Sequence, residues 1–148
     1  MSADWALVRR AVCEGRARDM VSPYDVAHGG YGLVYLATPY TFHARLGRGR
    51  WATEQAVAKA ARLAWLGVTA ISPIAIAEPM CGANSGLDPL DEEFWSGWCG
   101  PLLKRAEAVL VADIPGWHQS AGCCYEAIEC LRSGRPLLIE AETAEVWG

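Results

Sequence analysis

The chain has 148 residues, of which 52% are hydrophobic and 20% are charged. This composition predicts one domain with a substantial core and excludes an intrinsically disordered chain. The formal net charge of -4 argues against a nucleic acid as the main partner, because a phosphate backbone attracts basic proteins. No apolar run reaches the roughly 18 residues of a membrane span, and the first residues lack the basic start of a signal peptide. We therefore expect a cytoplasmic protein with no membrane partner.

Six cysteines are present, and none of them forms a CxxC pair. This spacing gives no zinc signature, so the sequence predicts no metal site, and no motif in it calls for a cofactor. In the reducing cytoplasm we expect free thiols that fill small apolar spaces.

The N-terminal part is predicted to stand apart from the main domain. Residues 4–21 show an imperfect helical spacing of apolar side chains, and the turn-rich segment 22–32 follows. Residues 1–30 are therefore predicted to form a helical extension, and residues 31–148 an α/β domain.

Strand and helix patterns alternate after this extension. "LVYLAT" at 33–38 predicts a buried strand, and a polar loop with several basic side chains leads to an alanine-rich helix over 51–66. "GVTAISPI" at 67–74 predicts a second strand. The long segment 75–93 is predicted to be a loop, and loops of this length are more often functional than idle.

The C-terminal half continues the same alternation. A helix is expected from about residues 88–91 to Leu103, interrupted at Gly100 and Pro101, and is followed by a third strand at 108–114. A helix over about 121–133 closes at Gly134, and "PLLIEA" gives a fourth strand. This order predicts an α/β fold, a flavodoxin-like three-layer sandwich with a parallel sheet of four to five strands.

Parallel sheets of this kind bind ligands beyond the carboxyl ends of their strands. The loops after Leu36, Ser72 and Asp113 are therefore expected to converge on one rim, where a site would lie.

The stretch "SAGCCYE" at residues 120–126 carries the main candidate for chemistry on that rim. Ser120 is a good N-cap, and the free amides behind it favour an anion. Gly122 and Glu126 are four residues apart and share one helix face, so a ligand at the helix start can reach the Glu126 carboxylate. The alternative interpretation is an ordinary cap and a solvated acid.

Two stretches, "LVYLATPYT" and "AEAVLVADIPGWHQSAGCCYEAIECLRSGRPLLI", resemble the nucleoside 2-deoxyribosyltransferase superfamily, which includes 2'-deoxynucleoside 5'-phosphate N-hydrolases. The resemblance covers roughly Leu33 to Ile139. It implies that Glu126 attacks the anomeric carbon of the sugar, that Ser120 binds the sugar or a 5'-phosphate, and that Tyr35 lines the site. The substrate-binding residues predicted on this basis are Tyr35, Thr38, Pro39, Gly116, Trp117, Ser120 and Gly122.

The acid that would assist Glu126 is not evident. By the resemblance it belongs on the helix before the third strand, near Cys99, which is not acidic. Asp113 is the candidate catalytic replacement, and Asp88 and Asp91 are alternatives. For Trp117, stacking on a base and packing at a subunit contact both stay open.

The basic loop after the first strand also has two interpretations. His43, Arg45, Arg48 and Arg50 can neutralise a phosphate, or they form a solvated loop.

The expected function is cleavage or transfer of the N-glycosidic bond of a nucleoside or nucleotide through a glycosyl-enzyme intermediate on Glu126. An alternative is a catalytically silent nucleotide-binding or sensor domain on the same fold, suggested by Cys99. A third, an unrelated flavodoxin-like binding module, requires that Glu126 point away from the pocket. Relatives are commonly oligomers, so a homodimer or higher homo-oligomer is expected.

Overall fold

The computed structural model describes residues 3–146, and its centre is a five-stranded parallel sheet in the order β1-β5-β4-β2-β3. The strands are β1 (Ala17–Arg18), β2 (Val34–Ala37), β3 (Ala70–Ile71), β4 (Ala108–Val111) and β5 (Leu137–Ile139). The helices are α1 (Ala6–Cys13), α2 (Pro23–His28), α3 (Thr41–Ala44), α4 (Gly49–Trp65), α5 (Pro73–Cys81), α6 (Glu92–Arg105), α7 (Ala121–Arg132) and α8 (Thr143–Val146), and the 3₁₀-helix η1 spans Trp117–Gln119.

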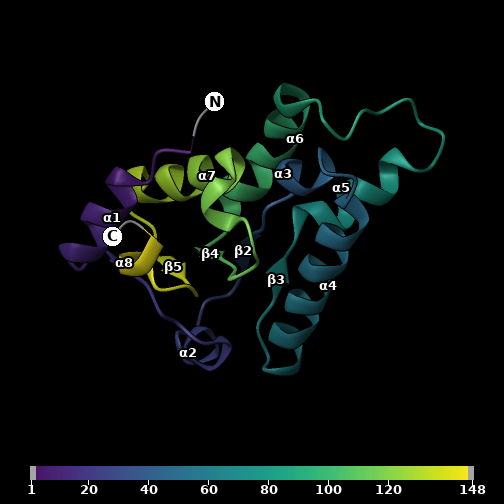
Figure 1. The fold of residues 1–148 in the computed structure, drawn as a ribbon. Coiled ribbons are helices and arrows are strands. Elements are labelled where there is room, and N and C mark those ends of the chain that lie inside the picture. Colours follow the sequence, from purple (N-terminus) through teal and green to yellow (C-terminus); the bar gives the residue numbers. More distant parts are fainter. Residues whose placement is uncertain (1–2, 147–148) are drawn as a thin grey trace.

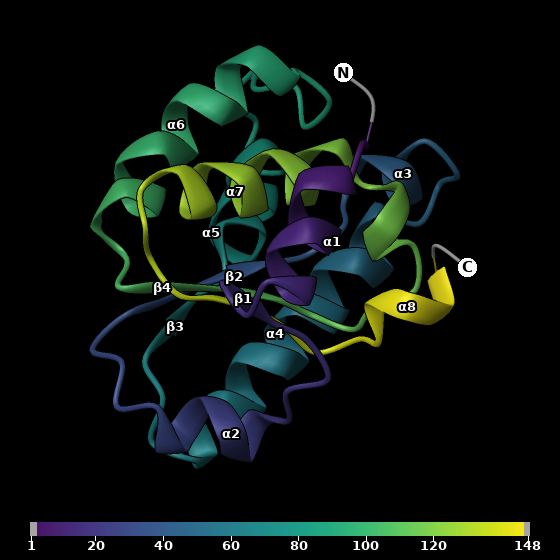
Figure 2. The same cartoon turned by 90° about the vertical axis from the view of Figure 1, so that its left-hand side faces the viewer.

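Helices cover both faces of the sheet, which makes three layers (Figures 1 and 2). Helices α1, α6 and α7 lie on one face, and α2 and α4 lie on the other. Along β2, Tyr35 and Ala37 face the α7 side, while Val34 and Leu36 face the α4 side, as strand alternation requires. The predicted flavodoxin-like three-layer sandwich is confirmed.

The two central strands explain why the sheet could be recognised in the sequence. All four residues of β2 and all four of β4 are buried, because helices cover them on both sides. Strands of this kind appear as continuous apolar runs and not as alternating ones. Their carboxyl ends lead into the segments that begin at Thr38 and Ala112.

The N-terminal segment is not an appendage, so the predicted boundary at residue 30 does not separate two structural units. Trp5 and Val8 of this segment pack in the same core as α7, and Val26 packs in the core on the opposite face. Strand β1 pairs with β5 and extends the sheet by one strand. The sequence pattern missed β1 because two residues are too few to show periodicity.

Two predictions between residues 75 and 105 are wrong. Residues 75–81 are helical, because Ser72 caps α5 by accepting from the Ala75 amide at 3.3 Å and Pro73 occupies the first turn. Helix α6 runs through Gly100 and Pro101 without a break. Pro101 lacks an N–H, but Pro101 and Gly97, whose carbonyl would be its hydrogen-bond partner, are both exposed, so the missing hydrogen bond is tolerated.

Candidate functional site

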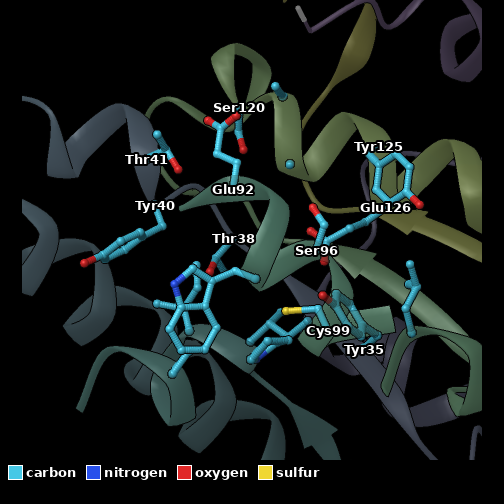
Figure 3. A pocket seen from close by; sticks show the side chains of 18 of the residues that line it. Tyr35, Thr38, Tyr40, Thr41, Glu92, Ser96, Cys99, Ser120, Tyr125 and Glu126 are labelled. Carbon is cyan, nitrogen blue, oxygen red and sulfur yellow. The ribbon is translucent and has the colours of Figure 1, made fainter. Parts of the chain in front are cut away.

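A cavity of about 610 Å³ opens beside the carboxyl end of β2, between α6 and α7. Its walls come from β2 and the segment after it, from the starts of α3 and α5, and from one side each of α6 and α7. Figure 3 shows the side chains that line it. The cavity lies on the rim where the sequence placed the site.

Glu126 projects from the middle of α7 into this cavity (Figure 3). Among residues 3–146 its carboxylate takes part in no hydrogen bond and no ion pair. Burial without a partner penalises the charged form, so the pKa of Glu126 rises to about 8. The requirement of the third alternative, that Glu126 point away from the pocket, is not met. A perturbed, unpaired acid in a cavity is a typical mark of a functional site.

Ser120 caps α7 as predicted. Its hydroxyl oxygen accepts a hydrogen bond from the Cys123 amide at 3.1 Å, which leaves the hydroxyl proton free to be donated to a ligand. Gly122 lines the cavity next to it, and the closest atom to a Cβ built at this position would be Ser120 Oγ at 3.8 Å. The small residue therefore keeps the helix start open.

Two buried hydroxyls from the end of β2 also line the cavity. Tyr35 is 1% exposed and Thr38 is 6% exposed, and neither Tyr35 Oη nor Thr38 Oγ1 has a hydrogen-bond partner. Buried polar atoms normally have partners. A bound molecule or an ordered water would therefore supply the missing hydrogen bonds of these two hydroxyls. Four predicted residues, Tyr35, Thr38, Ser120 and Gly122, thus meet around Glu126.

Three predicted substrate-binding residues and the predicted acid are not among the residues that line the cavity. Trp117 is 3% exposed and packs edge-on against Trp5 with ring centroids 5.0 Å apart, so it belongs to the core and is available neither to a base nor to a second subunit. Pro39 and Gly116 are buried as well. Asp113 is exposed, and its amide donates to Glu140 Oε1 at 3.2 Å.

Asp88 and Asp91 do not supply the missing acid either. Asp91 caps α6 by accepting from the Phe94 amide at 3.2 Å, and Asp88 accepts from the Leu90 amide at 2.9 Å. Cys99 does line the cavity. Burial raises the pKa of its thiol to about 11, so the thiol stays protonated and is a poor proton donor at neutral pH.

His43 fixes the loop that leads to Ser120. Its ring is buried, and Nε2 donates to the Pro115 carbonyl at 2.5 Å, while Nδ1 is buried without a partner. The ring lies against Trp51 with centroids 4.9 Å apart. The side chain is thus turned inward and cannot neutralise a phosphate. Of the four basic-loop residues, only Arg45 lines the cavity.

Sequence reasoning missed most of the wall supplied by α5 and α6. Glu92, Trp95 and Ser96 from α6 and Glu78 from α5 line the cavity, as does Tyr40 from the segment after β2. The sequence indicates this wall only through the prediction that the long segment 75–93 is functional. Which of its side chains face the cavity depends on α5, which the sequence pattern does not predict.

Within the described range 3–146, no group of three His, Cys, Asp or Glu side chains is placed to hold a metal ion. In that same range no helix combines the length and apolar character needed to cross a bilayer.

Fold and cavity together define an α/β protein with an unpaired, half-buried glutamate in a cavity at the carboxyl edge of a parallel sheet. Residues 32–142 match the protein family described as "Domain of unknown function (DUF1937)", and the chain belongs to this family. The match begins just before β2 and ends after β5, so it contains every element that lines the cavity. A comparison with curated proteins finds no significant match.

Proposed function

We propose that this protein cleaves or transfers the N-glycosidic bond of a nucleoside or nucleotide, with Glu126 as the nucleophile. The observation that carries the proposal is the carboxylate of Glu126, which is half-buried in the cavity without a partner, while the unsatisfied hydroxyls of Tyr35 and Thr38 line the same cavity. A structural carboxylate would be paired or solvated. This one is held ready for a bound molecule.

In the proposed reaction the Glu126 carboxylate attacks the anomeric carbon, the C–N bond breaks, and the base departs with the bonding electron pair. The base takes up a proton from water, and the sugar stays attached to Glu126 as an ester. Water then hydrolyses the ester, or a second base attacks the sugar and gives the transfer product. Every atom comes from the substrate, the carboxylate and water, so the reaction needs no cofactor.

The cavity walls suit such a substrate. Tyr40 and Trp95 provide aromatic surface on which a base can stack, and Ile74 from α5 adds apolar surface to the lining. Hydroxyls of Tyr35 and Ser120 can bond to a sugar. A cavity of about 610 Å³ lies within the usual range for small-molecule sites.

Base release from a panel of deoxy- and ribonucleosides and their 5'-monophosphates, followed by chromatography, tests the proposal. We expect release by the wild type and a loss of at least a thousandfold in Glu126→Ala and Glu126→Gln, because removal of a nucleophile abolishes the covalent route. Glu54→Gln is the matched control, because Glu54 is an exposed acid on α4, outside the cavity. Release that persists in Glu126→Ala would contradict the nucleophilic role.

The silent binding domain remains the second candidate, and the observation that favours it is the thiol of Cys99 in the cavity wall where an acid is expected. Binding of nucleotides without base release at any pH would support it. Cys99→Asp separates the two cases further. It should increase base release if the missing acid limits the reaction.

We also propose that the protein forms a homodimer or higher homo-oligomer in the cytoplasm. Leu46 and Tyr125, which line the cavity, are 58% and 42% exposed, and a second subunit placed over them would close the site. The six free cysteines fit a reducing compartment. Light scattering after gel filtration measures the mass, and a monomer at micromolar concentration would refute self-association.

A further inference from the structure

An ion pair lies at the polar end of the cavity, and its two charges affect which substrate groups can bind there. Glu92 lies in the first turn of α6, and Figure 3 shows its side chain directed toward the start of α7, where Ser120 lies. Arg45 Nη2 lies 3.6 Å from Glu92 Oε1. Both residues line the cavity. Among the described residues, Arg45 is the cation at this end of the cavity, and it is paired with a carboxylate in a solvent-exposed ion pair.

Glu126 fixes which end of a substrate lies here, on the basis of the proposed function. Its carboxylate must face the carbon that joins sugar and base. The cavity wall also carries aromatic and apolar side chains, namely Tyr40, Ile74 and Trp95, against which a base can lie. Ser120 lies six residues, or about 9 Å, back along α7 from Glu126, and the Glu92 side chain is directed toward it (Figure 3). With the anomeric carbon at Glu126, the exocyclic group of the sugar fits beside Ser120 and the Arg45–Glu92 pair.

The other cations of the cavity cannot help to bind an anion at that end. Arg135 donates to the backbone carbonyls of Leu103 and Ala106 and holds the end of α6. Lys104 is twelve residues beyond Glu92 on the same helix, which corresponds to about 18 Å. A phosphate beside Ser120 would therefore meet the Glu92 carboxylate without an unpaired cationic side chain, and the free amides at the start of α7 are its only favourable contact among the described residues at this end. Those amides can serve a hydroxyl oxygen equally well.

A hydroxyl in the same place has a better environment. It can donate to the Glu92 carboxylate, and hydrogen bonds to a charged acceptor are stronger than neutral ones. The Glu92 carboxylate therefore raises the affinity for a hydroxyl and lowers the affinity for a phosphate. Both effects widen the difference between the two affinities, and this difference is the specificity.

We propose that Glu92 is a specificity-determining residue that selects nucleosides with a free sugar hydroxyl and rejects nucleoside 5'-phosphates. Arg45 orients the Glu92 carboxylate toward the cavity. This inference rests on the proposed function, of which it names the substrate class.

The test measures kcat/KM for base release from a deoxynucleoside and from its 5'-monophosphate, with wild type, Glu92→Gln and Glu92→Ala. The wild type should prefer the nucleoside. Both variants should shift the ratio toward the monophosphate by about tenfold or more, because a repulsive charge and a charged acceptor are removed together. Glu93→Gln is the matched control, because Glu93 is an exposed acid next to Glu92 on α6 that does not line the cavity, and it should leave the ratio within about twofold.

Binding of the same two compounds to Glu126→Gln, by calorimetry, gives a second measurement that needs no turnover. A wild type that prefers the monophosphate, or a ratio that Glu92→Gln and Glu92→Ala leave unchanged, would overturn the role of Glu92 while the glycosidic function stands. If no compound is cleaved and neither binds, the proposed function itself fails, and the inference fails with it.

Discussion

The raised pKa of Glu126 makes a prediction about stability that does not depend on any substrate. Burial lifts this pKa from 4.5 to about 8 in the folded protein. The unfolded chain loses the Glu126 proton near pH 4.5, whereas the folded chain keeps it until about pH 8. Because the folded-state pKa is the higher one, the stability that protonation provides is complete at low pH and is lost as the pH rises.

The magnitude follows from the same two values. One pKa unit corresponds to about 1.4 kcal/mol, so between pH 5 and pH 8 the free energy of unfolding should fall by up to about 4 kcal/mol through Glu126. Glu126→Gln removes this dependence, because glutamine keeps the shape and has no proton to lose. The stability of Glu126→Gln relative to wild type should therefore increase steadily across this range.

Urea denaturation of the wild type and Glu126→Gln at pH 5, 6, 7 and 8 measures this difference. Glu54→Gln is the control, since Glu54 is exposed on α4. Other titrating groups cancel in the comparison, because they are common to all the proteins. A difference between Glu126→Gln and wild type that stays constant from pH 5 to pH 8 would refute the assignment of an unpaired carboxylate with a raised pKa.

Three further outcomes are expected. The kcat/KM for base release should rise with pH and level off above about 8, because only ionised Glu126 attacks; a decline above that pH would show that its protonated form acts. His43→Leu should lower the free energy of unfolding by about 1–3 kcal/mol and raise KM, since the bond to the Pro115 carbonyl is lost, while His43→Gln should recover part of both; unchanged urea curves and KM would contradict this role. Gly116→Ala should cost about 1–3 kcal/mol in thermal or urea unfolding, because Gly116 has φ +90° and a Cβ would lie 2.9 Å from Phe42 Cδ1; a neutral effect would disprove the close approach.

The sequence was most informative where one local feature decides the structure. The continuous apolar runs of β2 and β4 identified strands covered on both faces, and Ser120 and Gly134 marked the two ends of α7 through their capping chemistry. Gly134 indeed has φ +71°, which favours glycine. Because the spacing of Ser120, Gly122 and Glu126 fixes one helix face, this side of the cavity could also be predicted.

The rest of the cavity depends on tertiary packing that no local pattern contains. Helix α5 was hidden because Pro79 and the turn residues after it suggest a loop. The start of α6 was predicted to within a residue or so, but without α5 and the packing of α6 against α7 nothing in the sequence indicated that Glu92 faces α7. Trp117 shows the opposite error. A tryptophan in a glycine- and proline-containing loop suggested an exposed ring, but α1 folds over the loop and buries it against Trp5.

The pairing of β1 with β5 has a consequence for how the chain is made. Its register joins Ala17 to Leu137, and α1 packs on α7 in the same core. During synthesis, residues 5–18 emerge from the ribosome well before the residues of β5 and α7 with which they pack. Their apolar side chains stay uncovered until those partners emerge, so closure of the sheet at this edge is a long-range step. Folding at this edge therefore waits for β5, however early α1 and β1 are made.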